Sequence, residues 1–554
     1  MVPAWKEEDI IDKMIINAFK MADYKNYDIF VGAYPNDGGT QKSLEEILNK
    51  NKRVHLIINK KEGPTNKAQN LNSIYQGIKD FENKLGKRFD ILLIQDSEDI
   101  IHPLSLKLFN FLIPPNDMVQ IPIFPIESEM NLRNFFKYLT SATYADEFAE
   151  NHTKDIIVRK YSKGVIPSAG VGTAFSRVAL DEVARKNEGY VFNEDNITED
   201  YEFSIRLNEL EMKLDYFVEG VRRVDDKGRK TLEYISTREF FPNSFSAARR
   251  QKSRWVYGIT FQTPRQHTLK GKTLSEKYSL LRDRKARYMN MIILPAYGVF
   301  VYCVYDIIYN LVTGQPSNVT NMIFPFLTPI WFVVVADTVI AVERIINRFT
   351  AVKEIYGKKH AIASTLIPPV LSIRLIWGNI INFFATLDAW KTFIFGGRKK
   401  VKWIKTVHKS YAPEEILNQY KRKMGDLLLE NKMVKEDELI EALKYQRRTD
   451  TLLGASLLAK GYVTKDKLNY IRTKQLRAYP EELRLEDLNL DLIYLVPEVI
   501  AKSGKVLPIG KLEGSLLLAK VEGEKDSFTQ TLTKKTGMKV EYVNLPGEKL
   551  EPLL

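Results

Sequence analysis

Residues 90–99 read DILLIQDSED, and this stretch decides the fold expected for the N-terminal half of the chain. Its apolar run, Ile91–Ile94, is typical of a short buried strand and passes directly into carboxylates. Runs of the same kind lie at Tyr27–Ala33, Val54–Ile58 and Met118–Phe124. Helix-like stretches such as Asn66–Lys84 separate them, and this alternation predicts an α/β domain with a mostly parallel sheet over residues 1–270.

The composition excludes several classes of protein. The chain has 554 residues, too many for one core, and its 44% hydrophobic and 27% charged residues exclude a largely disordered protein. The formal net charge of +13 indicates an anionic membrane face or an anionic substrate such as a nucleotide diphosphate. No RNA-binding signature appears, so we expect no nucleic-acid partner. One cysteine, Cys303, allows no disulfide within the chain and indicates a reducing compartment.

Four polar motifs carry the candidate chemistry: Asp96-Ser97-Glu98-Asp99, Gly63–Asn72, Ile197-Thr198-Glu199-Asp200 and Gln251-Lys252-Ser253-Arg254-Trp255. The first follows a strand, where ligands bind in open α/β folds, and Mg²⁺ or Mn²⁺ would bridge its carboxylates to a diphosphate. The second places a lysine in the first turn of a capped helix, which suits phosphate. Taken singly, each motif is equally explained as an acidic turn, an ordinary helix cap, a surface salt bridge or a core aromatic.

Together, the four motifs resemble the GT-A catalytic domain of glycosyltransferase family 2, particularly the processive cellulose and hyaluronan synthases. The resemblance implies a catalytic set of Glu199, Asp200, Gln251, Arg254 and Trp255, with Asp200 as the base. It implies metal binding by Asp96 and Glu98, and donor binding by Pro3, Glu7, Asp37, Lys67 and Asp96. Residues 168–173 resemble the acceptor-side loop.

The resemblance also implies an inverting mechanism. Asp200 would take the proton of the acceptor hydroxyl while UDP departs, and the metal and Arg254 would stabilise the growing charge on the diphosphate. Two positions depart from the family pattern. The usual Asp-Asp-Gly is replaced by residues 33–37, so Asp37 is expected to recognise the base. The second metal ligand is glutamate, and Asp99 competes for that role.

The segment 271–410 has the character of a membrane region with a basic linker. Met289–Val312 and Met322–Ile346 are long enough to span a bilayer. The loop between them, Thr313–Asn321, has no lysine or arginine and is expected outside. A third apolar run, Ala361–Trp390, contains Pro368-Pro369 and Arg374, so we expect it to be re-entrant or interfacial. Buried core helices are the alternative. Met1–Trp5 reads as the end of a strand, so we expect the natural protein to begin upstream.

Residues 411–554 contain an internal repeat, with copies at 423–446 and 452–475. The copies resemble the tandem motif of MshEN domains, which bind cyclic di-GMP; two ordinary helical hairpins are the alternative. The resemblance implies cyclic di-GMP binding by Lys423, Gly425, Leu428, Leu429, Leu439, Leu443 and Gln446 in the first copy and by Gly454, Leu457, Leu458, Leu468 and Gln475 in the second. An ATPase is excluded, because the glycine that a P-loop needs five residues before Gly271 is Gln266.

The order of transferase, membrane helices and MshEN domain resembles the NfrB-type family of phage-adsorption factors. We therefore expect a bacterial inner-membrane transferase with cytosolic catalytic and sensor domains. Its expected function is processive synthesis of an exopolysaccharide from a UDP-sugar, activated by cyclic di-GMP. The expected partners are the growing polysaccharide, an outer-membrane export partner and the lipid bilayer. Two alternatives remain: a non-processive transferase acting on a lipid, and a catalytically degenerate scaffold for envelope assembly or phage adsorption.

Overall fold

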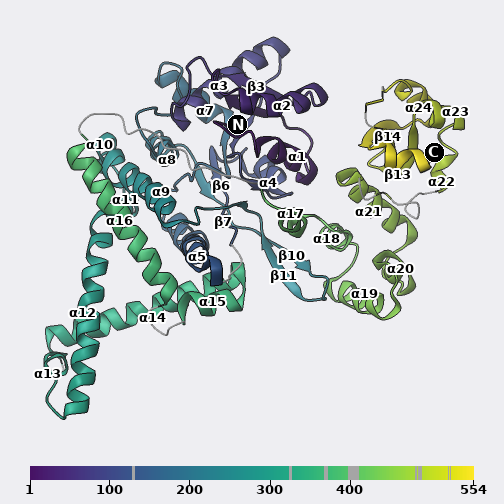
Figure 1. The fold of residues 1–554 in the computed structure, drawn as a ribbon. Coiled ribbons are helices and arrows are strands. Elements are labelled where there is room, and N and C mark those ends of the chain that lie inside the picture. The colour runs from purple at the N-terminus through teal and green to yellow at the C-terminus, as the bar shows by residue number, and fades with distance from the viewer. Residues whose placement is uncertain are drawn as a thin grey trace. The chain divides into compact units, whose positions relative to one another are not determined.

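The computed structural model describes residues 1–127, 132–323, 327–366, 372–396, 411–480, 483, 490–521, 523–524 and 526–553 (Figure 1). The chain divides into two compact units. Unit 1 comprises Met1–Ala18, Tyr24–Glu219 and Ile235–Pro413, and unit 2 comprises Phe19–Asp23, Gly220–Tyr234 and Glu414–Leu554. The hairpin at 220–234 therefore belongs with the C-terminal repeats, although it comes from the N-terminal half of the sequence.

The strands of unit 1 form small sheets. The first is parallel and has the order β1 (Val2–Pro3), β2 (Ile29–Ala33), β3 (Val54–Ile58). The second sheet has four strands in the order β4 (Ile91–Ile94), β8 (Thr173–Ser176), β6 (Met118–Gln120), β9 (Leu214–Tyr216). The third sheet has three strands in the order β5 (Ile100–Ile101), β12 (Thr237–Glu239), β7 (Ile123–Pro125). Since β8 runs antiparallel to both β4 and β6, the expectation of a mostly parallel sheet is wrong for this part of the fold, while the α/β class is confirmed.

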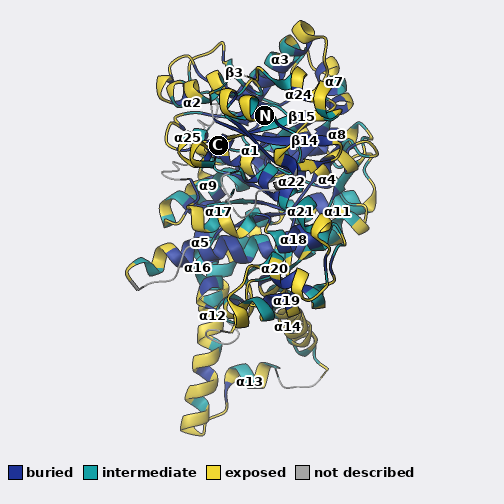
Figure 2. Ribbon diagram, turned by 90° about the vertical axis from the view of Figure 1, so that its right-hand side faces the viewer, coloured by how far each residue is buried: buried dark blue, intermediate teal, exposed yellow. Residues whose placement is uncertain are grey.

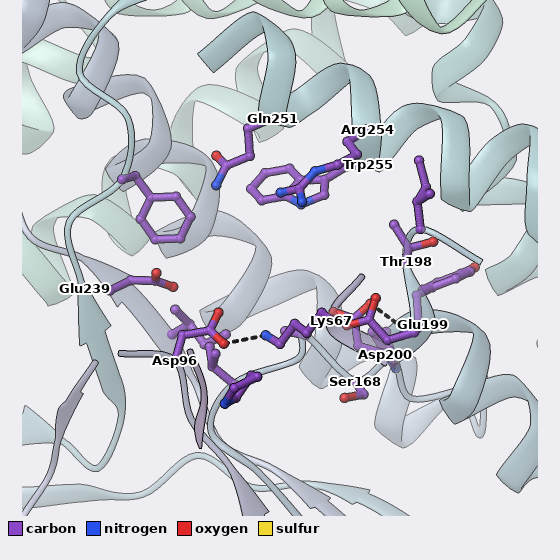
Figure 3. Close-up of a pocket in the computed structure, with 18 of the residues that line it drawn as sticks. Lys67, Asp96, Ser168, Thr198, Glu199, Asp200, Glu239, Gln251, Arg254 and Trp255 are labelled. Carbon is purple, nitrogen blue, oxygen red and sulfur yellow. Dashed lines mark hydrogen bonds and ion pairs between the residues drawn. The ribbon is translucent and has the colours of Figure 1, made fainter. Parts of the chain in front are cut away.

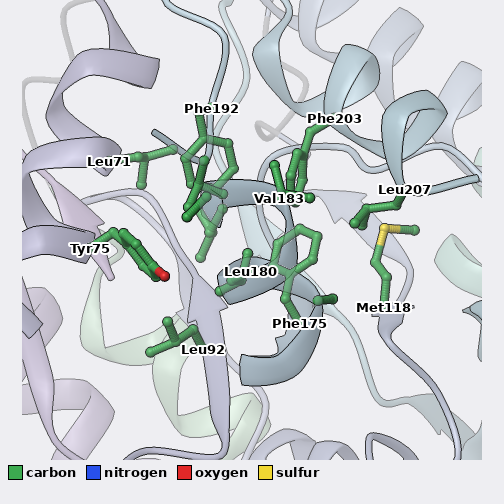
Figure 4. Close-up of a cluster of buried hydrophobic side chains, with 14 of the residues drawn as sticks. Leu71, Tyr75, Leu92, Met118, Phe175, Leu180, Val183, Phe192, Phe203 and Leu207 are labelled. Atoms are coloured by element: carbon green, nitrogen blue, oxygen red, sulfur yellow. The ribbon is translucent and has the colours of Figure 1, made fainter. Parts of the chain in front are cut away.

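Helices cover these sheets and enclose the main core. Their bounds are α1 Ile11–Met21, α2 Gly38–Lys50, α3 Lys67–Leu85, α4 Ser105–Leu112, α5 Phe135–Glu150, α6 Ile156–Tyr161, α7 Arg177–Lys186, α8 Glu199–Glu209, α9 Phe245–Tyr257, α10 Thr263–Gln266 and α11 Leu274–Arg284. In the core, Leu71 and Tyr75 of α3 meet Phe175 of β8 and Phe203 of α8 (Figure 4). This packing fixes the first turns of α3 and α8, which carry Lys67 and Asp200.

Five helices follow, α12 Ala286–Thr313, α13 Asn318–Ile323, α14 Pro329–Tyr356, α15 Lys358–Thr365 and α16 Ile373–Phe395. Within the described ranges, α12 is the one helix long and apolar enough to cross a membrane, and only 6% of its most apolar stretch is buried (Figure 2). The second predicted span lies largely in α14. This helix is long enough to cross a membrane, but Asp337, Glu343 and Arg344 make it less apolar than α12. A second membrane crossing stays a prediction.

Part of the third apolar run packs against α5 and α9. Arg374 at the start of α16 is 3% exposed and pairs with Asp146 at 3.1 Å and Glu127 at 3.2 Å. Protein carboxylates thus neutralise the charge that would be costly in lipid. Along the rest of α16, Asn382 and Asp388 contact α9. The Pro368-Pro369 pair and the basic segment 398–405 lie outside the described residues.

Unit 2 begins with helical repeats and ends in a small sheet. Its helices are α17 Glu414–Tyr420, α18 Met424–Glu430, α19 Glu436–Thr449, α20 Leu453–Ala459, α21 Lys465–Ala478, α22 Leu490–Ile493, α23 Glu498–Ser503, α24 Thr529–Thr536 and α25 Gly547–Leu550. Its strands are β10 Gly220–Val224, β11 Lys230–Tyr234, β13 Val506–Leu512, β14 Ser515–Val521 and β15 Lys539–Leu545. Both repeats fold alike: a Cβ on Gly425 would lie 3.3 Å from Leu439, and one on Gly454 would lie 3.1 Å from Leu468.

Candidate active site

A cavity of about 430 Å³ opens where the strand ends of unit 1 meet the first turns of α3 and α8 and one face of α9 (Figure 3). Most of the residues singled out in the sequence line it: Pro3, Glu7, Lys67, Asp96, Glu98, Glu199, Asp200, Gln251, Arg254 and Trp255. These residues come from segments up to about 250 positions apart, so the tertiary fold brings together what the motifs predicted separately. The result is one polar cavity with an aromatic wall.

Lys67 and Asp96 form the central ion pair of the cavity. Lys67 is the first residue of α3, whose N-cap Asn66 accepts a hydrogen bond from the Gln69 amide. Its Nζ lies 2.6 Å from Asp96 Oδ1 and donates to the Gly170 carbonyl at 3.2 Å. Burial lowers the Lys67 pKa, but the nearby carboxylates, led by Asp96, outweigh it and raise the pKa above its usual value. The lysine is therefore a permanent cation where a phosphate would bind.

The acidic pair Glu199-Asp200 opens helix α8. Asp200 Oδ1 accepts a hydrogen bond from the Tyr201 amide at 2.8 Å. Burial raises the pKa of both carboxyls, and that of Glu199 reaches about 8. Gly170 faces Asp200 with φ +79°, and a Cβ there would lie 2.6 Å from Asp200 Oδ2. A glycine is therefore required beside Asp200, both for backbone conformation and for space.

Helix α9 presents Gln251, Arg254 and Trp255 to the cavity (Figure 3). Burial lowers the pKa of Arg254, and the charges of Glu199, Asp200 and Asp96 oppose that effect. The Trp255 ring stands edge-on to Tyr144 at 6.1 Å, which places an aromatic wall beside the polar groups.

Ion pairs fix the position of α9. Lys252 bonds Glu147 at 2.6 Å, and Arg249 bonds Asp388 of α16 at 2.5 Å and 2.6 Å. Helix α16, which lies in the segment predicted to be re-entrant or interfacial, thus holds α9, the helix that carries Arg254.

The carboxylates near Asp96 differ in what they contact. Glu98 lines the cavity, whereas the Asp99 side chain is fully buried and accepts the Asp96 amide at 2.7 Å. The proposed competition from Asp99 is thus unsupported, because that side chain holds the turn. Glu239 at the end of β12 also lines the cavity and was missed in the sequence, because no motif surrounds it.

Several carboxylates line the cavity, among them the predicted metal ligands Asp96 and Glu98. Among the described residues no group of three or more His, Cys, Asp or Glu is placed to hold a metal. Asp96 and Glu98 would hold a cation that takes its remaining ligands from the diphosphate and water, as Mg²⁺ usually does.

Comparison with known proteins agrees with this geometry. The family model described as "Glycosyltransferase like family 2" matches residues 1–258. The "Bacteriophage adsorption protein B" of Escherichia coli (strain K12) is 34% identical over 98% of this chain and 72% of its own length. The chain belongs to the bacteriophage adsorption protein B family. Its N-terminal domain, residues 1–258, is a family 2 glycosyltransferase domain.

Two further matches have lower identity to this family member. The "Type IV pilus assembly ATPase PilB" of Myxococcus xanthus (strain DK1622) is 26% identical over 121 residues, which is 22% of this chain and 21% of that protein. The mannosyltransferase of Pyrobaculum calidifontis in complex with GDP-Man and Mn²⁺ covers 72% of this chain and 86% of its own, with 12% identity and a TM-score of 0.41.

One donor-site prediction for the family 2 domain is not supported. Asp37 does not line the cavity, because its carboxylate caps α2 and accepts hydrogen bonds from the Lys6 amide at 2.6 Å and Thr40 Oγ1 at 2.8 Å. Trp5 and Tyr34 line the cavity instead, with their rings edge-to-face at 5.2 Å. An N-cap and a base-binding aspartate look alike in sequence, since both precede a helix.

The structure places the repeat residues of the second domain mostly in a core. Leu428, Leu439, Leu443 and Leu457 are buried there, and Leu429 and Leu468 pack against it. Leu458 is 39% exposed, and Gln475 is buried and accepts a hydrogen bond from Arg472 at 3.4 Å. Lys423 is the N-cap residue of α18 and lies two positions before Gly425. Gly425 is itself buried and Gly454 is half-buried, so Lys423 and Leu458 are the most exposed residues of the predicted nucleotide site.

Proposed function

We propose that this chain is an inverting glycosyltransferase that adds sugars from a UDP-sugar to a growing polysaccharide. The observation that carries the proposal is the convergence of Asp200, Arg254 and the Lys67–Asp96 pair on one cavity. A single base suffices for inversion, because no covalent intermediate with the sugar is formed.

In the proposed reaction, Asp200 accepts the proton of the acceptor hydroxyl as its oxygen attacks the anomeric carbon. The bond to UDP breaks on the opposite face of the sugar. Arg254 and Lys67 stabilise the negative charge on the departing diphosphate. Bound by Asp96 and Glu98, Mg²⁺ or Mn²⁺ would supply further neutralisation of that charge. The raised pKa of Asp200 suits a base that must hold a proton during the step.

The aromatic wall favours a sugar acceptor. Phe148, Phe241 and Trp255 line the cavity, and Trp255 lies 6.2 Å and 6.4 Å from the two phenylalanine rings. Aromatic faces pack well on the apolar faces of sugar rings. This wall supports polymer synthesis over transfer to a lipid, and product length on a gel separates the two. The presence of Lys67, Asp200 and Arg254 in one cavity disfavours a degenerate scaffold.

The direct experiment is a sugar-transfer assay with the purified full-length chain in detergent. A panel of UDP-sugars is supplied with Mg²⁺ or Mn²⁺, UDP release is measured, and the product is identified by mass spectrometry. The expected result is UDP release with one donor and a polymeric product. Absence of UDP release with every donor would overturn the enzymatic proposal and favour the scaffold.

The repeats support activation by cyclic di-GMP, which is the second part of the proposal. A ligand activates only as far as it binds the active state more tightly than the inactive one, and such coupling typically amounts to about 5- to 150-fold. Calorimetry should detect binding, and Gln446→Ala and Gln475→Ala should weaken it. A chain that binds no cyclic di-GMP, or whose rate is unchanged at saturation, contradicts this part.

We also propose that the chain resides in the bacterial inner membrane, with both domains in the cytosol and an outer-membrane export partner. The apolar helix α12 supports a membrane location. Cysteine substitutions in Thr313–Asn321 should react with an impermeant reagent from outside, whereas Lys358→Cys should not. External labelling at position 358 would contradict the cytosolic placement.

A further inference from the structure

We propose that the β10–β11 hairpin, residues 220–234, transmits the state of the first repeat to the transferase. In this proposal Arg223 anchors the hairpin on that repeat, and Asp226 occupies the position of a ligand phosphate beside Lys423. The inference rests on the proposed binding and action of cyclic di-GMP. The contacts between the hairpin and the first repeat lie within unit 2.

Arg223 provides the anchor. Its Nε and Nη2 donate to the two oxygens of Asp426 at 2.9 Å and 2.7 Å, and it also pairs with Glu233 on β11. Further bonds run to the carbonyls of Gln419 at 2.9 Å and Lys421 at 3.1 Å. The Arg223 side chain is 12% exposed and that of Asp426 is 4% exposed. A bidentate pair this well shielded from water is far stronger than a surface ion pair.

The anchor lies at the start of the first repeat. Asp426 also accepts the Lys423 amide at 2.9 Å, which closes the first turn of α18. Arg223 therefore grips the turn that contains Lys423 and Gly425, two residues of the predicted nucleotide site. Next to it, Val224 packs against the apolar core formed by α18, α19 and their repeat partners. The hairpin is thus built into the fold of the repeat.

The tip of the hairpin places a carboxylate where a phosphate would bind. Lys423 Nζ lies 2.9 Å and 2.7 Å from the two oxygens of Asp226. This pair is exposed, with 56% of the lysine side chain and 77% of the aspartate side chain accessible, so a ligand can replace it at little cost. A cyclic dinucleotide whose phosphate takes Lys423 must therefore displace Asp226.

The chain itself links the hairpin to the cavity. It enters and leaves the hairpin at one point, where the Ile235 amide donates to the Glu219 carbonyl at 3.0 Å. The segment that leaves becomes β12, and Glu239 at the end of β12 lines the cavity. Two residues, Ile235 and Ser236, separate the hairpin from β12, so in this proposal a shift of the hairpin acts on β12 through them.

The test compares variants of the full-length chain in two measurements, calorimetric binding of cyclic di-GMP and UDP release with and without it. In Arg223→Met the nucleotide should still bind, but the activation ratio should fall to about one. The matched control is Arg222→Met. Its side chain is 81% exposed and forms a surface ion pair with Glu436 of the same repeat at 3.6 Å, which contributes little, so both measurements should stay unchanged. In Asp226→Asn the nucleotide should bind about 1.5- to 5-fold more tightly, because a competing surface ion pair is gone.

Wild-type activation in Arg223→Met would overturn the inference. If Arg223→Met does not fold, Asp226→Asn decides: an unchanged dissociation constant overturns the inference and a smaller one supports it. A wild-type chain that does not bind or respond to cyclic di-GMP overturns the proposed regulation, and the inference with it. This failure is distinct, because it appears before any variant is made.

Discussion

Replacing Asp200 with asparagine removes the proposed base with little change in shape. Asparagine keeps an oxygen able to accept the Tyr201 amide, a bond of 2.8 Å in the wild type. The side chain also keeps its size. The space beside it is narrow, because a Cβ added to Gly170 would lie 2.6 Å from Asp200 Oδ2. The substitution therefore changes charge and basicity, while the first turn of α8 keeps its structure.

The expected loss follows from the role of a positioned base. General-base catalysis typically contributes about 10²- to 10⁴-fold, which corresponds to about 3–5 kcal/mol of transition-state stabilisation. Binding of UDP should change much less, because Lys67, Arg254 and the Asp96 carboxylate remain. We expect kcat to fall by at least about 100-fold, while the dissociation constant of UDP changes by less than about tenfold.

The assay pairs single-turnover UDP release with calorimetric UDP binding. The matched control is Asp195→Asn, an exposed residue of the loop before α8 that does not line the cavity, and it should transfer sugar at the wild-type rate. Transfer by Asp200→Asn within about tenfold of the wild type would refute the assignment. Loss of UDP binding in the same variant would instead indicate that Asp200 serves the donor.

Three other predictions concern metal, charge and pH. Excess chelator should abolish transfer, and added Mn²⁺ or Mg²⁺ should restore it; full activity in chelator would contradict the metal assignment of Asp96 and Glu98. Lys67→Met should lower kcat/KM by about 10- to 100-fold, the worth of a charged hydrogen bond to phosphate, and steady-state kinetics that show no change would exclude that role. Burial lowers the His267 pKa, but the bonds from Glu202 and Glu209 outweigh it and raise the pKa to about 9. The protonated histidine therefore stabilises the folded state fully below the unfolded pKa of 6.5, and this stabilisation is lost as the pH rises through about 9. His267→Gln should thus lower Tm most at pH 6 and little at pH 10. The loss of folding free energy at pH 6 should reach up to about 3 kcal/mol. A Tm difference that does not depend on pH would contradict this.

Local patterns in the sequence determined the features that local physics controls. The strand predicted at Val54–Ile58 has those bounds in the structure, and the helix predicted from Asn66 begins at Lys67 with Asn66 as its cap. The carboxylates of residues 96–99 follow a strand as expected. Apolar periodicity and helix caps act over a few residues, so a short stretch carries the full signal. The two repeats were predicted in the same way, because each copy carries the local sequence pattern of its two helices.

The tertiary structure alone decided which polar groups face the cavity. Asp37 and Asp99 look like site residues in sequence, yet one caps a helix and the other holds a buried turn, while Glu239 has no motif and lines the cavity. Arg374 is costly in lipid only if it has no partner, and its partners lie more than 200 residues away in the sequence. The attachment of the hairpin to the first repeat likewise joins Arg223 to Asp426. Such contacts depend on long-range packing between segments whose local patterns are unrelated, so no stretch of sequence read by itself contains them.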